Sequence, residues 1–156
     1  MERPIIGFHQ DAANDWVAEL GCGHSQHVRH QPPFTLRPWV VTEEGRATKL
    51  GALLDCVRCA RFEIPEHFVA TRRTPDFTES TVPAGLLKNH TTKAGTWARI
   101  VVLEGTLRYV VESLGHSQVL SPGDIGVVVP EVPHHVEPIG TVRFHVEFLS
   151  APRVGA

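Results

Sequence analysis

Three cysteines, all within the first 59 residues of a 156-residue chain, restrict how its N-terminal part can fold. Cys56 and Cys59 form a Cys-x-x-Cys pair, and Cys22 stands far upstream among histidines. An odd number of cysteines does not fit a disulfide framework. In a reducing compartment this pattern indicates metal or redox chemistry instead.

The candidate metal ligands lie in a predicted hairpin and at the end of the N-terminal segment. Cys-x-x-Cys is the usual spacing of a two-thiolate zinc knuckle, and thiolate and imidazole suit tetrahedral Zn²⁺. A Cys-Gly-His step at a tight turn supplies a second pair, and its glycine permits the bend. We therefore predict that one Zn²⁺ is bound by Cys22, His24, Cys56 and Cys59. His27 is the alternative fourth ligand.

A metal also fits the size of this segment. About sixty residues bury only a small core, and such domains often depend on a bound metal or on disulfide bonds. We expect strands at residues 16–20 and 26–30 and a short helix within residues 43–54. Two other interpretations of the thiols remain open: ordinary surface cysteines, or a redox pair. A redox pair usually opens a helix in a βαβ unit, and that pattern is not visible here.

Composition and charge exclude several classes of protein. Hydrophobic residues make up 42% of the chain, enough for a globular core. The first sixty residues carry six Lys/Arg against seven Asp/Glu, and the remainder nine against ten, so no nucleic-acid partner is expected. Apolar runs such as residues 125–129 are too short to cross a bilayer, and no cleavage signal is visible. We expect a cytoplasmic protein without a membrane partner.

From Phe62 onward, short β-rich segments alternate with turn signals such as Pro-Gly-Asp at residues 122–124. The predicted strands are residues 97–103, 106–112, 118–120, 125–129 and 142–149. Regular spacing of short strands favours an antiparallel sandwich or barrel. The sequence thus predicts a mainly β chain: a zinc-stabilised domain at residues 1–60, then an antiparallel β-barrel at residues 61–156.

The most specific spacing in the second half runs from the Pro-Gly-Asp turn to His134. The turn leads into a strand, a proline-containing loop follows, and His134 begins the next strand. Cupins place a metal-ligating histidine in this way, at the barrel mouth where small ligands bind. Upstream, VVLEGTLRYVV is similar to the hairpin of the first cupin motif. His135 is expected to point away, because adjacent residues of a strand face opposite sides.

A reduced metal site in the barrel could use His90, His134 and Glu147, three ligands that leave positions open on a divalent cation. Arg99 is predicted to point into the barrel, where it would bind an anion beside His134. The alternatives stay open: His90 and Glu147 as loop or outward strand residues, and Arg99 as a surface arginine.

Two resemblances support these predictions. Residues 5–59, with IIGFHQD, WVAELGCGHSQHVRHQPP, RPWV, EGR and LGALLDCVRC, resemble a short bacterial family of zinc-ribbon-like domains without an established function. Residues 63–150 resemble the TehB/YeaR-like cupin family through PEHFVATRRTPDFTESTVPAGLLKNHTTKAGTWARIVVLEGTLRY, LSPGDIGVVVPEVPHHVEP and VRFHVEFL. The chain departs from the usual cupin motifs at Ala98, where a glutamate is expected, and at Val129 and Glu131.

The second resemblance implies a metal-containing protein that binds a small molecule, with an anion as one option, and a link to tellurite resistance or to nitrosative and oxidative stress. The alternative is a metal-dependent cupin enzyme, dioxygenase- or isomerase-like; the missing motif glutamate and second histidine count against it. The methyltransferase domain of some TehB proteins is not carried over, because the chain has no Gly-rich cofactor loop. By analogy with cupins, a homodimer is expected.

Overall fold

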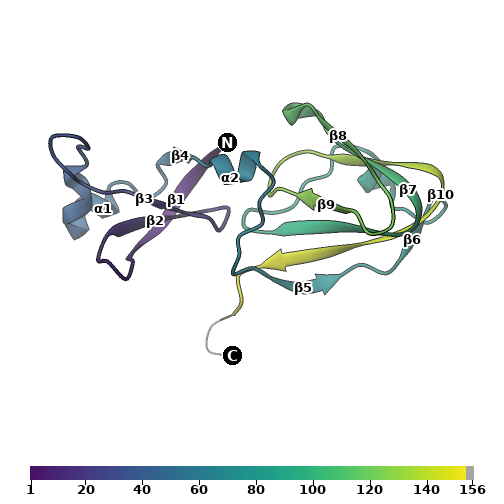
Figure 1. Cartoon of the computed structure of the whole chain (residues 1–156), viewed down its shortest axis with the longest axis horizontal. Coiled ribbons are helices and arrows are strands. Elements are labelled where there is room, and N and C mark those ends of the chain that lie inside the picture. Colours follow the sequence, from purple (N-terminus) through teal and green to yellow (C-terminus); the bar gives the residue numbers. More distant parts are fainter. Residues whose placement is uncertain (154–156) are drawn as a thin grey trace. The chain divides into compact units, whose positions relative to one another are not determined.

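The structure is a computed structural model that describes residues 1–153. It divides into two compact units, Met1–Cys59 and Ala60–Ala156 (Figure 1). Strands dominate both units, so the predicted mainly β fold class is confirmed. None of the helices within residues 1–153 combines the length and the apolar character that a bilayer crossing requires.

The N-terminal unit is built on a four-stranded antiparallel sheet in the order β3-β2-β1-β4. Its strands are β1 (Glu2–Gln10), β2 (Trp16–Leu20), β3 (Ser25–His27) and β4 (Leu53–Asp55). Strand β1 was not predicted, although it pairs with both β2 and β4. It therefore joins the predicted hairpin to the segment that precedes the Cys-x-x-Cys pair.

The helices of this unit are short: η1 (Pro38–Val41), α1 (Glu43–Ala47) and α2 (Val57–Ala60). Helix α1 begins where the Thr42 hydroxyl accepts a hydrogen bond from the Gly45 backbone at 3.0 Å. It covers less than half of the predicted residues 43–54, because Gly51 adopts a φ of 86° and the chain then enters β4. The core holds only five Val, Leu and Ile side chains: Ile5, Val17, Leu20, Val28 and Val40.

The C-terminal unit contains a six-stranded antiparallel sheet. Its elements are β5 (Val69–Arg73), β6 (Phe77–Thr78), η2 (Ala84–Leu87), β7 (Trp97–Val111), η3 (Glu112–Leu114), β8 (His116–Leu120), β9 (Ile125–Val128) and β10 (His135–Ser150). The sheet runs β5-β10-β7-β8, with β6 also paired to β10 and β9 to β7. One part of β7 pairs with β9 and another part with β8, so the sheet curls.

The long strands β7 and β10 pair along almost their whole lengths (Figure 1). Two segments predicted as separate strands, 97–103 and 106–112, are therefore one strand. Gly105 makes this possible, because its φ is 76° and a Cβ there would lie 1.9 Å from the Thr141 carbonyl oxygen. The turn signal in the sequence marks a bend opposite a bulge rather than a chain reversal.

The core of the C-terminal unit lies on the concave side of the curled sheet. Its buried members are Ala98, Ile100, Val102, Leu107, Tyr109, Val111, Leu120, Val128, Val136, Val142, Phe144 and Val146. The buried Tyr109 hydroxyl donates to the Val127 carbonyl at 2.7 Å, so the ring can be buried without an unpaired polar group. This concave side also contains the candidate site of the unit.

Candidate functional site

Four buried side chains of the N-terminal unit converge, with their ligand atoms all within 4.8 Å of one another: Cys22, His24, Cys56 and Cys59. The Nδ1 atom of His24 lies 3.4, 3.3 and 3.7 Å from the three sulfur atoms, in sequence order. Tetrahedral zinc, with bonds of about 2.3 Å to sulfur and 2.0 Å to nitrogen, separates its ligand atoms by about 3.5–3.8 Å. The cluster can therefore hold a metal ion, and its spacing suits zinc.

The backbone of the N-terminal sheet brings these residues together. Cys22 and His24 lie in the turn between β2 and β3, where Gly23 adopts a φ of 96°. The turn is closed by hydrogen bonds from Leu20 to His24 and from Gly23 to Leu20, both 2.9 Å. Cys56 follows β4, and Cys59 lies in α2. Because β1 pairs with both β2 and β4, the two halves of the cluster meet beside the first residues of β1.

Two of the thiols, Cys22 and Cys59, have pKa values shifted in opposite directions. The pKa of Cys22 is lowered to about 4, chiefly because its sulfur accepts a hydrogen bond from the Cys59 thiol. The pKa of Cys59 is raised, because it donates that bond and is itself buried. Bound zinc requires thiolates and releases their protons, so the metal would replace this shared proton as the positive partner of the sulfur atoms.

The other histidines of the predicted hairpin lie outside the cluster. His27, the alternative ligand, is exposed and pairs through Nε2 with Asp11 at 2.8 Å. His30 accepts a hydrogen bond at Nδ1 from the Arg37 backbone at 2.9 Å. The structure thus groups His24, and neither of these histidines, with the three cysteines.

The C-terminal unit contains a cavity of about 220 Å³ on the concave side of its sheet. Most of its wall is apolar, with aromatic side chains from β6 and β10. The lining residues are Thr74, Phe77, Pro83, Gly85, Leu86, His90, Thr92, Ala98, Ile100, Val128, His134, Val136, Phe144, Val146 and Phe148. The described lining includes neither lysine nor arginine, so any charge at this site comes from its two histidines.

His90 and His134 are held side by side by the backbone. Each donates its amide hydrogen to the other's carbonyl, at 2.7 and 2.9 Å, and their ring centroids lie 5.4 Å apart. The Nδ1 atom of His134 lies 3.2 Å from the Val132 carbonyl, as expected for a donor, which leaves Nε2 as the acceptor. Burial, aided by His90 and His135, lowers the pKa of His134. The imidazole is therefore neutral at neutral pH.

His90 carries an unused hydrogen-bonding atom. Its Nδ1 is buried and has no partner within the described residues. An unpaired buried polar atom costs about 1–3 kcal/mol, so a ligand that bonds to it would recover part of that cost. Two imidazoles at one end of an apolar cavity can orient a small polar group.

Arg99 and Glu147, which were predicted to belong to the barrel site, do not line the cavity. Ala98 and Ile100 line the cavity, so Arg99 between them faces the opposite side of β7. Glu147 likewise lies between Val146 and Phe148, which line the cavity. Arg99 and Glu147 instead form an ion pair, with Nε and Oε2 3.4 Å apart. Only His90 and His134 of the predicted barrel ligands come together.

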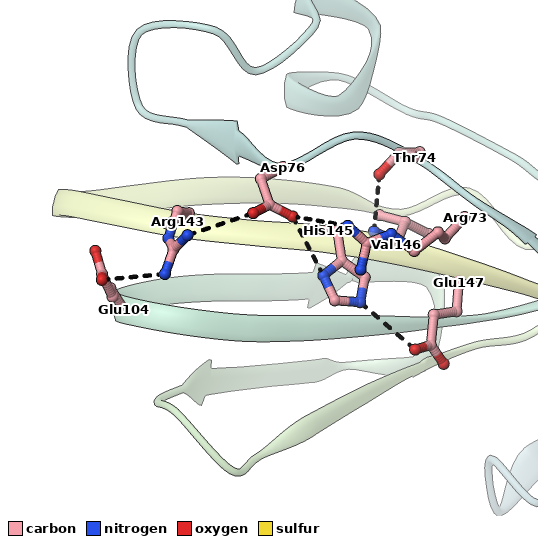
Figure 2. Close-up of polar contacts among 8 residues, drawn as sticks. All are labelled: Arg73, Thr74, Asp76, Glu104, Arg143, His145, Val146 and Glu147. Carbon is pink, nitrogen blue, oxygen red and sulfur yellow. Dashed lines mark hydrogen bonds and ion pairs between the residues drawn. The ribbon is translucent and has the colours of Figure 1, made fainter.

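Figure 2 shows the outward-facing polar network to which Glu147 belongs. The buried His145 ring lies between two carboxylates, 3.6 Å from Asp76 and 3.5 Å from Glu147. Arg143 extends the network to Asp76 at 3.5 Å and to Glu104 at 3.1 Å. Asp76 was not predicted to belong to any site, because it comes from the loop after β5 and meets β10 only in the folded chain.

His135 also lies away from the cavity. Its Nε2 is 3.0 Å from the Glu137 carboxylate, on the side of the strand opposite to Val136. The sequence expectation for the two adjacent histidines and the observed positions agree: His134 lines the cavity and His135 does not.

The two units are similar to different known proteins. Residues 72–146 match the family described as TehB-like domain. Residues 6–63 match DUF3565, described as a protein of unknown function. The YeaR proteins of Escherichia coli K12 and O157:H7, both described as uncharacterized, are 29% identical over 102 residues, which cover 59% of this chain and 86% of YeaR.

Two solved structures resemble the C-terminal unit. The first is a structural-genomics crystal structure of a protein from Escherichia coli K12; it has a TM-score of 0.52 and 28% identity, over 58% of this chain and 98% of that one. The second, TehB from Haemophilus influenzae, has a TM-score of 0.50 and 24% identity, over 55% of this chain but only 32% of TehB. The TehB likeness concerns the fold alone. The chain thus joins a segment that is similar to DUF3565 proteins to a second segment that is similar to TehB-like domains and to YeaR.

Proposed function

We propose that this chain is a metal-containing protein that binds a small molecule: zinc stabilises the N-terminal unit, and the cavity of the C-terminal unit holds the ligand. The observation that carries the second part is a largely apolar cavity of about 220 Å³ with two imidazoles at its polar end. Ligand pockets characteristically combine apolar walls with a few fixed polar groups.

The size of the cavity limits the ligand. A cavity of about 150 Å³ lined by apolar side chains is sufficient to bind benzene. The 220 Å³ available here therefore suits one ring, or an aliphatic group of similar size, with a short substituent. A neutral hydroxyl or carbonyl would suit the polar end, because His134 is uncharged at neutral pH and His90 offers a free Nδ1.

The same geometry argues against the enzyme alternative. A catalytic metal usually has three protein ligands and an open position. His90 and His134 supply two, and the predicted third, Glu147, lies on the other face of the sheet. The support for chemistry on a barrel metal is therefore weaker than the support for binding.

The proposed role in tellurite or nitrosative and oxidative stress rests on the TehB-like match of residues 72–146. Growth of a deletion strain on tellurite and under nitric oxide, with the wild-type chain and a cavity-filled variant as complements, tests this role. Equal growth of all three strains under both stresses would remove the link and leave the binding proposal intact.

Titration with 3-phenylpropan-1-ol tests the cavity directly. This probe carries one ring and one neutral hydroxyl, and binding can be followed by calorimetry. Ala98→Leu should abolish binding, because Ala98 is 1% exposed and lines the cavity. Ala70→Leu is the matched control, because Ala70 is an exposed residue of β5 outside the cavity lining.

Unfolding of Ala98→Leu would make its loss of binding uninformative, so circular dichroism of each variant accompanies the titration. Ala98→Val, a smaller change at the same position, then serves as the second cavity variant. No binding to the wild-type protein, or equal binding to the wild type and a folded cavity variant, would overturn the proposal.

A further inference from the structure

A second hollow in the C-terminal unit lies beside the cavity and shares part of its wall. This groove has a volume of about 910 Å³. Three residues line both spaces: His90, Thr92 and Phe148. The groove also has a different chemistry from the cavity, and the proposed function does not yet account for it.

The wall of the groove is basic and rich in hydroxyl groups. Its lining residues are Val69, Thr71, Arg72, His90, Thr91, Thr92, Lys93, Thr96, Phe148, Ser150, Pro152 and Arg153. Arg72, Lys93 and Arg153 bring three positive charges, and none of the described lining residues is acidic. A concave surface lined by charges of one sign concentrates ions of the opposite sign.

The position of Arg72 links the groove to the cavity. Strand β5 lies beside the end of β10 (Figure 1). In their pairing, Arg72 is opposite Phe148. The guanidinium carbon of Arg72 lies 4.2 Å from the centroid of the Phe148 ring. Because that ring lines both spaces, Arg72 is held at the boundary between them. A planar guanidinium there can donate two parallel hydrogen bonds to a carboxylate.

We propose that cavity and groove form one site for a small amphipathic organic anion. Its apolar part occupies the cavity, and its anionic group lies in the groove near Arg72 and Lys93. The inference rests on the proposed binding function and names the class of ligand. Arg72 and Lys93 then take the role that the sequence assigned to Arg99, because Arg99 faces the opposite side of the sheet.

Three probes with the same phenylpropyl skeleton test the inference: 3-phenylpropionate, 3-phenylpropan-1-ol and 3-phenylpropylamine. At low salt the carboxylate should bind about tenfold more tightly than the alcohol, because it gains two exposed ion pairs, with Arg72 and Lys93, and each contributes about 1.4- to 5-fold. The ammonium should bind most weakly. In about 1 M salt the preference for the carboxylate should shrink toward equality, because exposed charges are screened over about 3 Å.

The double substitution Arg72→Gln with Lys93→Gln should remove the preference for the carboxylate and leave binding of the alcohol within about twofold. Arg108→Gln is the matched control, because Arg108 is a partly exposed arginine that pairs with Glu137 and does not line the groove. It should keep the preference. Binding of the alcohol also reports whether each variant is folded.

The outcomes separate the two proposals. Binding of the alcohol with no preference for the carboxylate, or a preference that survives the double substitution, overturns the anion site and leaves the cavity proposal standing. Failure of the wild-type protein to bind the alcohol overturns the cavity proposal, and this inference falls with it.

Discussion

Removal of metal from the N-terminal unit should unfold that unit and leave the C-terminal unit folded. The perturbation is a zinc chelator, or substitution of one cluster residue, such as Cys59→Ser or His24→Ala. Only five Val, Leu and Ile side chains are buried in this unit, so its apolar core is small. The buried cluster Cys22, His24, Cys56 and Cys59 joins the turn after β2 to the segment after β4.

The expected outcome follows from comparing the stability of the unit with the contribution of bound zinc. A typical stability of roughly 0.05–0.15 kcal/mol per residue gives about 3–9 kcal/mol for the residues of Met1–Cys59. Structural zinc in small domains contributes about 10–16 kcal/mol at neutral pH. Because the metal contribution exceeds the whole expected stability, loss of the metal should leave the unit unfolded rather than merely weakened.

Two of the three tryptophans report on this unit. The guanidinium carbon of Arg46 lies 3.7 Å from the centroid of the Trp16 ring. The ring centroids of Trp39 and Phe8 are 5.9 Å apart. Trp97 is fully buried in the other unit. Tryptophan fluorescence and circular dichroism during chelation should therefore show a partial loss of structure, while a colorimetric assay measures one zinc released per chain.

His27→Ala is the control for His24→Ala. His27 is exposed and paired with Asp11, so its loss should change stability by no more than about 0.5 kcal/mol and keep the zinc. A purified native protein without metal, spectra that chelation leaves unchanged, or equal zinc loss in the two histidine variants would each refute the argument.

Three further predictions concern the C-terminal unit. His134→Ala should weaken binding of 3-phenylpropan-1-ol measured by calorimetry, whereas His135→Ala should not, because only His134 lines the cavity; equal effects would contradict the assignment. Since burial lowers the pKa of His134 from its ordinary 6.5, its neutral form supports the fold fully above about pH 6.5, and that support is lost as the pH falls through the lowered pKa. Thermal melts should show this acid-side loss, and His134→Phe should reduce it. Gly105→Ala should lower the free energy of unfolding in urea by more than about 2 kcal/mol, because a Cβ would lie 1.9 Å from the Thr141 carbonyl oxygen. Gly115→Ala is the control: its φ is 61° but its surroundings are open, so it should lower that free energy by about 1 kcal/mol.

The sequence was most informative where spacing is local. Cys22 and His24 share one turn, and Cys56 and Cys59 are three residues apart, so ligand geometry constrains each pair without knowledge of the fold. The Pro-Gly-Asp turn and the position of His134 after it are similarly short-range. These features predicted the buried thiol cluster and one wall of the cavity.

The remaining features depend on pairing between distant segments. Alternation along a strand separates two faces but does not say which face is inside, so Arg99 and Glu147 were placed on the wrong side of the sheet. Bulges in the pairing of β10 shift its register further. The hairpin of β1 with β2 is local, but the pairing of β1 with β4, some fifty residues away, could not be predicted from spacing. The network around His145 depends on Asp76, which no local pattern connects to β10.

The central position of β10 in its sheet has a consequence for synthesis on the ribosome. β5 and β6 pair with β10, which is made after every other strand of the unit. Until residues 135–150 have left the exit tunnel, those two strands have no partner and the edge of β7 that pairs with β10 stays without hydrogen-bond partners. The N-terminal unit, in contrast, can fold once Cys59, the last member of its cysteine cluster, has emerged. A nascent chain should thus carry one finished unit and one aggregation-prone segment, the stage at which chaperones engage.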